Sequence, residues 1–231
     1  MTKNIFITGA SRGIGLELTR QYLSGGDRVY AGARNPDCDA LTALKSEHPD
    51  RLTPVALDVT DAASIAATVG VLGDTPIHLL INNAGIFKSK PAELETLDES
   101  TWLEEFRVNS ISPLMVTRAL KSNLAAAGSS VVGMMSSKMG SISDNTSGGD
   151  YSYRSSKAAL NAVSVSLAKD LAELGISVIA MNPGWVQTDM GGPNALIDVP
   201  TSARGLKGLL DKADLSVSGQ FFDYSGTALP W

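Results

Sequence analysis

Residues 8–15 read Thr8-Gly9-Ala10-Ser11-Arg12-Gly13-Ile14-Gly15 and follow the apolar run Asn4–Thr8. Glycines at such a junction let the main chain turn sharply and approach a ligand closely. The helix that we expect to begin near Ile14 offers free N–H groups and a positive dipole end to a pyrophosphate. The spacing is Gly-x-x-x-Gly-x-Gly and differs from the commoner Gly-x-Gly-x-x-Gly fingerprint. Its position at the first strand–helix junction favours phosphate binding over a simple reversal of the chain.

Short apolar runs alternate with longer segments of helical period along the rest of the chain. The runs are apolar throughout, which indicates strands buried on both faces and therefore a parallel sheet covered by helices. We expect strands at Asn4–Thr8, Arg28–Ala33, Leu52–Asp58, His78–Asn82, Ser130–Ser136, Ser177–Asn182 and Gly219–Phe222. We expect helices at Ile14–Leu23, Ala62–Leu72, Ser100–Leu124, Ser155–Leu174 and Ser202–Leu210. This order predicts one domain over residues 1–231, an α/β fold with seven parallel strands wound doubly between helices.

Composition and charge argue against several classes of protein. The 231 residues are 43% hydrophobic and carry a formal net charge of −5, which argues against a nucleic-acid or anionic-membrane surface. We see no signal-peptide layout, and no apolar stretch approaches the roughly 18 residues of a membrane span. Cys38 is the only cysteine, so an internal disulfide is impossible and we expect a reducing, cytoplasmic setting. His48 and His78 lack partners at metal-ligand spacing, so we expect no metal site.

Tyr153 and Lys157 lie four residues apart, which on a helix places a phenol and an ammonium on one face. A phenol ionises near pH 10. A lysine about 4–5 Å away is expected to lower that pKa by about two to three units, so that Tyr153 could exchange a proton with an alcohol or carbonyl. Tyr151 is the rival tyrosine, but residue 155 is Ser, so Tyr151 has no lysine one turn later.

Six motifs in the chain's order resemble those of the classical short-chain dehydrogenase/reductases. They are the glycine turn, Asp58-Val59, Asn82-Asn83-Ala84-Gly85, Asn109, Ser137 with Tyr153 and Lys157, and Pro183-Gly184-Trp185-Val186-Gln187-Thr188. The resemblance covers nearly the whole chain and implies a Rossmann-type NAD(P)-binding domain. Further stretches resemble the subgroup that contains bacterial C-factor and the sniffer-type carbonyl reductases: Met135–Ile142, Asn145–Gly149, Gly184–Gly192 and Leu229-Pro230-Trp231.

The resemblance implies a catalytic tetrad of Asn109, Ser137, Tyr153 and Lys157. The family's catalytic serine lies three residues before a glycine, which selects Ser137 over Ser136. By the same resemblance Tyr153 donates the proton, Lys157 also binds the nicotinamide ribose, and Asn109 holds a water that links Lys157 to solvent. The chain departs from the family pattern three residues after Asn109, where it has serine and many relatives have glycine.

The cofactor contacts that the resemblance implies lie in the glycine turn, at strand ends and in the Pro-Gly segment. They are Gly9, Ser11, Arg12, Gly13, Ile14, Gly15, Arg34, Asp58, Val59, Asn83, Ala84, Gly85, Tyr153, Lys157, Pro183, Gly184, Val186 and Thr188. NAD enzymes place an acid at the end of the second strand to bind the ribose 2′-hydroxyl, but this chain has Ala33-Arg34 there. A guanidinium suits a 2′-phosphate, and Arg12 could supply a second contact. Either arginine alone would also fit an ordinary solvated side chain; the pair, with the acid missing, favours NADP(H) over NAD(H).

These observations predict the reduction of an aldehyde, ketone or quinone to an alcohol, with Ser137 holding the substrate oxygen. Trp185 either lines the substrate pocket or packs in the core. The resemblance also implies a homodimer or homotetramer, paired through the helices expected at Ser100–Leu124 and Ser155–Leu174. The alternative is a dinucleotide-binding, C-factor-like signalling or regulatory protein whose reductase activity is weak or vestigial.

Overall fold

Seven strands form a single parallel sheet in the order β3-β2-β1-β4-β5-β6-β7. The structure is a computed structural model that describes residues 2–89 and 94–231. The strands are β1 (Asn4–Thr8), β2 (Arg28–Ala33), β3 (Leu52–Ala56), β4 (Leu79–Asn82), β5 (Ser130–Met135), β6 (Ile176–Asn182) and β7 (Phe221–Asp223). β6 is buried along its whole length, as an interior strand of a parallel sheet requires. The predicted α/β class and parallel sheet are confirmed.

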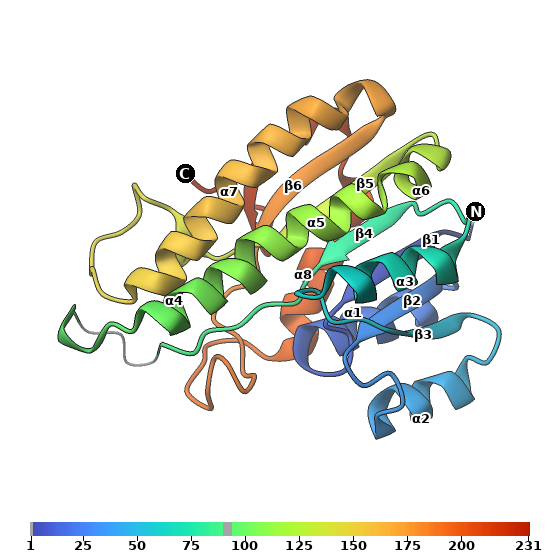
Figure 1. The fold of residues 1–231 in the computed structure, drawn as a ribbon, viewed down its shortest axis with the longest axis horizontal. Coiled ribbons are helices and arrows are strands. Elements are labelled where there is room, and N and C mark those ends of the chain that lie inside the picture. Colours follow the sequence, from blue (N-terminus) through green and yellow to red (C-terminus); the bar gives the residue numbers. More distant parts are fainter. Residues whose placement is uncertain (1, 90–93) are drawn as a thin grey trace.

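Helices cover both faces of the sheet (Figure 1). One face packs against α1 (Gly13–Ser24), α2 (Asp39–Glu47) and α8 (Val199–Lys212), whose apolar side chains join one core cluster. The other packs against α3 (Ala62–Leu72), α5 (Ser112–Ala119), α6 (Lys121–Ala126) and α7 (Tyr151–Leu171), which share a second cluster. α4 (Glu99–Phe106) lies against α7. Within the described residues, no helix is long and apolar enough to span a bilayer.

Two elements near the second and third strands differ from expectation. α2 was not predicted, because only Leu41 and Leu44 of its nine residues are buried and the helical period is correspondingly faint. β3 ends at Ala56 instead of Asp58. Asp58 is drawn out of the strand because its N–H donates to Ser64 Oγ (2.9 Å) and its carboxylate accepts from Thr60 N (2.9 Å).

The helix expected over Ser100–Leu124 is present but interrupted. A π-helical turn, Arg107–Ile111, separates α4 from α5, and α6 follows as a further helix. Two features widen the turn. Ser112 bonds the carbonyl of Arg107, five residues back, through both its N–H and its Oγ (2.7 Å). Pro113 has no N–H with which to continue the ordinary ladder. The widened turn contains Asn109. The serine that replaces the family's glycine therefore takes part in forming this turn.

Candidate active site

The site lies at the carboxyl edge of the sheet, where β1 and β4 are neighbours although they are far apart in the chain. A crevice at such a switch point is the usual ligand site of this architecture. Asn83 Nδ2 donates to the carbonyls of Thr8 (2.9 Å) and Gly9 (3.1 Å). The N–H groups of Asn83 and Ala84 both donate to Thr8 Oγ1 (3.0 Å each). The segment after β4 is thus joined to the glycine turn by the side chains of Asn83 and Thr8, each of which bonds main-chain groups of the other segment.

The glycine turn has a shape that only glycines allow. Gly9 and Gly13 have φ values of +66° and +55°. A Cβ on Gly15 would lie 2.3 Å from the carbonyl oxygen of Gly9. Among the described residues no side chain caps the N-terminus of α1, so its first N–H groups can serve a diphosphate. The expected turn contacts lie in this loop and in the first turn of α1: Gly9, Ser11, Arg12, Gly13, Ile14 and Gly15.

The end of β2 presents a cation beside a carboxylate. Ala33 is buried, and Arg34, the next residue, is exposed. Hydrogen bonds from Thr60 lower the pKa of Asp58, and the charge of Arg34 lowers it further. Arg34 and Asp58 therefore occupy the same region, as expected for the adenosine end of a dinucleotide. Val59 packs against the core cluster.

The segment after β6 lies against the glycine turn. Arg12 forms an ion pair with Asp189 (2.7 Å) between two largely exposed side chains. A Cβ on Gly13 would lie 3.6 Å from the methyl carbon of Thr188. Gly184 has a φ of +81°, which fixes the sharp turn that brings this segment back. The structure thus brings the Pro-Gly segment and the glycine turn together, with Arg12 directed at that segment.

Three members of the predicted tetrad meet where β5 ends and α7 begins. The hydroxyl of Ser137 accepts a hydrogen bond from Met139 N (3.1 Å), and it lies close enough to the phenol of Tyr153 to lower the pKa of that phenol against the effect of burial. Lys157 Nζ donates to the carbonyl of Met135 (2.8 Å) and lies 5.7 Å from the centroid of the Tyr153 ring. Tyr153 and Lys157 are both buried. A phenol, a hydroxyl and a buried ammonium are thus grouped within one site.

The rival residues are engaged elsewhere. Ser136 is buried and its hydroxyl donates to Asn161 Oδ1 (2.6 Å), which is a purely internal contact. Tyr151 is 39% exposed at the first position of α7. The structure therefore places Ser137 and Tyr153 at the site and leaves their neighbours outside it.

Asn109 reaches the site from the π-helical turn. Its Nδ2 donates to Ile86 O (2.9 Å) and Ser156 Oγ (3.0 Å), and its Oδ1 accepts from Ile86 N (2.9 Å). A Cβ on Gly85 would lie 3.3 Å from Asn109 Oδ1 and 3.5 Å from Lys157 Nζ. Asn109 and Lys157 therefore both approach the main chain at Gly85, which has no side chain. Because an amide oxygen can accept two hydrogen bonds, Oδ1 has capacity for a water.

The expectation that the pKa of Tyr153 falls below its ordinary value is wrong for this structure. Burial raises the pKa of Tyr153 to about 12; the Ser137 hydrogen bond opposes this rise and the Glu105 charge adds to it. Burial lowers the pKa of Lys157 to about 8, against the Glu105 charge, which raises it. Desolvation dominates because both groups lie in the interior. At pH 7 the phenol holds its proton and the amine is mostly charged.

Two residues of the site were missed from the sequence. The ring of Phe87 stacks on that of Tyr153, with centroids 4.1 Å apart and planes at 16°. Glu105 is fully buried and accepts from Lys88 N (2.7 Å). An acid four residues before Asn109 shares its helix face, and that spacing could have revealed Glu105. No sequence pattern distinguishes Phe87 from a core aromatic.

Trp185 lies at the surface, on the segment that follows β6. It is 51% exposed, which excludes core packing, and its Nε1 donates to the carbonyl of Gly191 (2.8 Å). Ile142 and Leu196, each 78% exposed, lie on the segments that follow β5 and β6. Apolar side chains are thus available on both segments that leave this edge of the sheet. The remaining expected contacts of the Pro-Gly segment are Pro183, whose carbonyl accepts from Ser202, and Val186, which is buried.

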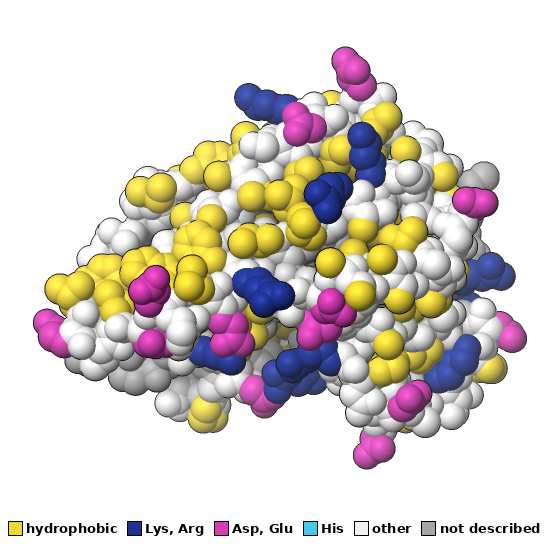
Figure 2. Space-filling model, viewed as in Figure 1, with side chains coloured by type: hydrophobic (Ala, Val, Ile, Leu, Met, Phe, Trp, Pro, Cys, Tyr) yellow, Lys and Arg dark blue, Asp and Glu magenta, His cyan; other side chains and the backbone are white. Residues whose placement is uncertain are grey.

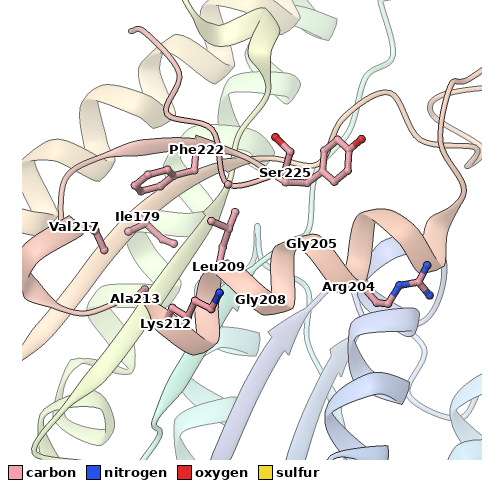
Figure 3. A pocket seen from close by; sticks show the side chains of 12 residues that line it. Ile179, Arg204, Gly205, Gly208, Leu209, Lys212, Ala213, Val217, Phe222 and Ser225 are labelled. Atoms are coloured by element: carbon pink, nitrogen blue, oxygen red, sulfur yellow. The ribbon is translucent and has the colours of Figure 1, made fainter.

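A groove of about 390 Å³ lies elsewhere, between α8 and the strands β6 and β7 (Figure 3). Its floor includes Ile179, Leu209 and Phe222, and Arg204 and Lys212 also line it. No residue of the tetrad or of the glycine turn lines this groove. The groove is therefore separate from the candidate active site.

Comparisons with known proteins agree with this geometry. Residues 3–195 match the family model described as short chain dehydrogenase. The C-signal of Myxococcus xanthus is 42% identical over 156 residues, which cover 68% of this chain and 93% of that protein. The NADPH-bound carbonyl reductase from chicken fatty liver superposes with a TM-score of 0.92 at 33% identity, covering 100% of this chain and 99% of the other. The carbonyl reductase Sniffer of Drosophila melanogaster also has a TM-score of 0.92 at 33% identity, covering 100% of both chains.

Proposed function

The chain belongs to the short-chain dehydrogenase family, and on that premise we propose that it reduces an aldehyde, ketone or quinone to an alcohol with NADPH. One observation carries the proposal. A buried phenol that keeps its proton at neutral pH lies beside the strand-end hydroxyl of Ser137 and the buried ammonium of Lys157, whose Nζ is 5.7 Å from the centroid of the Tyr153 ring. The resemblance to the C-factor and sniffer-type subgroup supports the same activity, since the chicken and Drosophila neighbours are carbonyl reductases.

The residues at the glycine turn fit NADP(H). The turn leaves no room for a Cβ at Gly15, and its helix N-terminus suits a diphosphate. Arg34, exposed at the end of β2 in place of an acid, suits a 2′-phosphate. Arg12 is directed at Asp189, so we assign the main 2′-phosphate contact to Arg34. NADPH, when bound, supplies the hydride.

The chain's own residues handle the substrate oxygen and the proton. Ser137 hydrogen-bonds the carbonyl oxygen and stabilises the charge that builds on it. Tyr153 gives its phenolic proton to that oxygen, which is far more basic as an alkoxide than a phenolate is. Lys157 is mostly charged at pH 7 and favours the phenolate that the transfer leaves behind. Asn109 supplies the oxygen at which a water can link Lys157 to solvent.

The test is NADPH oxidation by the purified chain against a panel of aldehydes, ketones and quinones, with NADH measured in parallel. We expect turnover of at least one carbonyl class and a higher specificity constant with NADPH. Tyr153→Phe is expected to lower turnover by about 10²–10⁴-fold. Tyr151→Phe is the matched control, because Tyr151 is half-exposed and outside the site, and it should behave as wild type. A panel without turnover, or an active Tyr153→Phe chain, would sink the proposal.

The similarity to the C-signal favours one second candidate, a signalling or regulatory protein with weak reductase activity. The panel of carbonyl substrates distinguishes the reductase from this signalling candidate. A chain that binds NADPH tightly but reduces no carbonyl would support the second candidate, whereas rapid turnover that depends on Tyr153 would support the first.

We also propose that the chain forms a homodimer or homotetramer through the helices of one face. Figure 2 shows hydrophobic side chains gathered on the face that carries α4, α5 and α7. Leu103 on α4 and Ile111 in the π-helical turn are 63% and 51% exposed. Light scattering of the purified chain tests this proposal, and a monomer at micromolar concentration would contradict it.

A further inference from the structure

Glu105 is a buried carboxylate to which the mechanism above gives no role. It is the penultimate residue of α4, directly before the π-helical turn, and its exposed fraction is 0%. Its Oε1 accepts hydrogen bonds from Lys88 N (2.7 Å), Ser89 N (3.1 Å) and Ser89 Oγ (3.2 Å). A buried charge is costly unless it is hydrogen-bonded, and these donors make the site suitable for an ionised carboxylate.

These hydrogen bonds hold one end of segment 86–89, the chain that leaves β4 after Gly85. Asn109 holds the other end through two hydrogen bonds with the main chain of Ile86 (2.9 Å each). Between the two anchors lies Phe87, whose ring stacks on Tyr153. The segment is also tied to α7, because Ser152 Oγ donates to Ser89 Oγ (2.7 Å). The ring of Tyr153 therefore rests on a segment that Glu105 and Asn109 fix from the same helical region.

Glu105 also differs from the other charged side chains around the site, because its charge acts on both titrating groups. Burial is the main influence on the pKa of Tyr153 and of Lys157, and Glu105 raises both pKa values. Among the residues that the structure describes, several other charged side chains of the surrounding elements have partners elsewhere. Lys88 pairs with Glu104, Lys138 with Asp144, Arg107 donates to Thr60 O, and Arg154 donates to Met139 O and Ser147 Oγ.

We propose that Glu105 is a positioning residue of the proton-transfer site: it fixes segment 86–89, and through Phe87 the ring of Tyr153, and it holds a negative charge in the same buried region as Lys157. The proposal deepens the reductase function and rests on it for the meaning of the site. Without this carboxylate, the lowering of the Lys157 pKa by burial would be less opposed. A larger fraction of Lys157 would then be unprotonated at working pH. The cation that favours the phenolate would then be lost at a lower pH.

The closing experiment measures the titration midpoint of Lys157 directly. The chain is labelled at its lysine side chains and titrated by heteronuclear NMR, and Lys157→Arg assigns the signal. The wild-type midpoint is expected near 8. Glu105→Gln keeps an acceptor oxygen for the main-chain donors and removes the charge, so we expect the midpoint to fall by about half a unit to one unit.

Two further variants make the result specific. Glu104→Gln removes the adjacent, half-exposed carboxylate that pairs with Lys88, and it should leave the Lys157 midpoint within about 0.2 unit of wild type. Glu105→Asp keeps the charge but shortens the side chain, so its midpoint should stay closer to wild type than that of Glu105→Gln. If Glu105→Gln fails to fold, Glu105→Asp and Phe87→Leu still test the positioning role, through lower kcat with a near wild-type Lys157 midpoint.

This titration needs no substrate, so its result does not depend on whether the chain proves to be a reductase. Where turnover is found, the high-pH limb of the kcat/KM profile should move to lower pH in Glu105→Gln and stay in place in Glu104→Gln. An unchanged Lys157 midpoint in Glu105→Gln would overturn the proposal. Equal shifts in Glu104→Gln and Glu105→Gln would do the same.

Discussion

The two halves of the site are held by different kinds of atoms. On the cofactor side, main-chain carbonyls and missing Cβ atoms set the shape: the side-chain amide of Asn83 bonds the carbonyls of Thr8 and Gly9, and Gly15 lies against Gly9. On the proton-transfer side, buried side chains set the chemistry, with Lys157 bonded to one carbonyl and Tyr153 stacked on an aromatic ring. Cofactor binding should therefore be sensitive to added side-chain volume. Proton transfer should be sensitive to the loss of a charge or of a hydroxyl group.

Lys157→Met should have the largest effect, because it removes the charge on which the second half depends. We expect kcat to fall by about 10²–10⁴-fold while the chain stays folded. Lys169→Met is the matched control, since Lys169 is exposed on the same helix. Steady-state kinetics on both variants gives the answer, and a Lys157→Met chain with near wild-type kcat would contradict the division between the halves.

The same variant has a stability signature with a defined sign. The pKa of Lys157 in the folded chain, about 8, lies below its ordinary value of 10.5, so the unfolded chain binds the proton more tightly. Below pH 8, burying the charged Lys157 therefore lowers the free energy of unfolding of the wild type by its full amount. Between pH 8 and 10.5 this destabilisation disappears and wild-type stability rises. Lys157→Met should be more stable than wild type at pH 7, by about 1–2 kcal/mol, with the gap closing toward about pH 10. Denaturant unfolding at several pH values measures it.

Gly15→Ala tests the first half by volume alone. Its methyl group would lie 2.3 Å from the carbonyl oxygen of Gly9, so the turn must shift. We expect NADPH affinity to fall at least about tenfold and the free energy of unfolding to fall by about 1–3 kcal/mol. Gly70→Ala is the control: Gly70 lies in α3 with nothing within 4 Å of the added Cβ, and the change should stabilise the helix by about 0.5–1 kcal/mol. Tight NADPH binding by Gly15→Ala would refute the role given to volume.

Arg34→Ala should have the smallest of these effects, because it removes one contact at the far end of the cofactor. Loss of a charge-assisted pair with the 2′-phosphate should weaken NADPH binding by about ten- to a hundredfold and leave NADH binding nearly unchanged. Arg12→Ala should do less, since Arg12 is already paired with Asp189. Fluorescence titration with both cofactors measures these affinities. An equal loss of affinity for NADPH and NADH would show that Arg34 does not bind the 2′-phosphate.

The cofactor half could be predicted from sequence because its signals are local. Continuously apolar runs indicated β1, β2 and β4 nearly to the residue, and the glycines of residues 8–15 marked the turn itself. The hydrogen bonds between Thr8 and Asn83 could not be predicted in this way, because they form only when β1 and β4 become neighbours in the sheet. α2 escaped detection since Leu41 and Leu44 are too few to show a helical period.

The proton-transfer half could be predicted only as a set of residue types. Tyr153, Lys157 and Ser137 were identified, but the pKa of Tyr153 was expected to fall and instead rises to about 12. That sign depends on burial, which spacing along a helix does not reveal. The burial of Glu105 likewise depends on tertiary structure, because its carboxylate is enclosed against segment 86–89, which lies 16 or more residues earlier in the chain.

Above all, we propose that Tyr153 supplies the proton beside a cofactor site that does not depend on it. The decisive experiment measures, on one preparation of Tyr153→Phe, the Kd for NADPH and the single-turnover rate of carbonyl reduction. We expect a Kd within about threefold of wild type and a rate lower by at least about a hundredfold. A rate near that of wild type, or a parallel collapse of NADPH binding, would contradict the proposal.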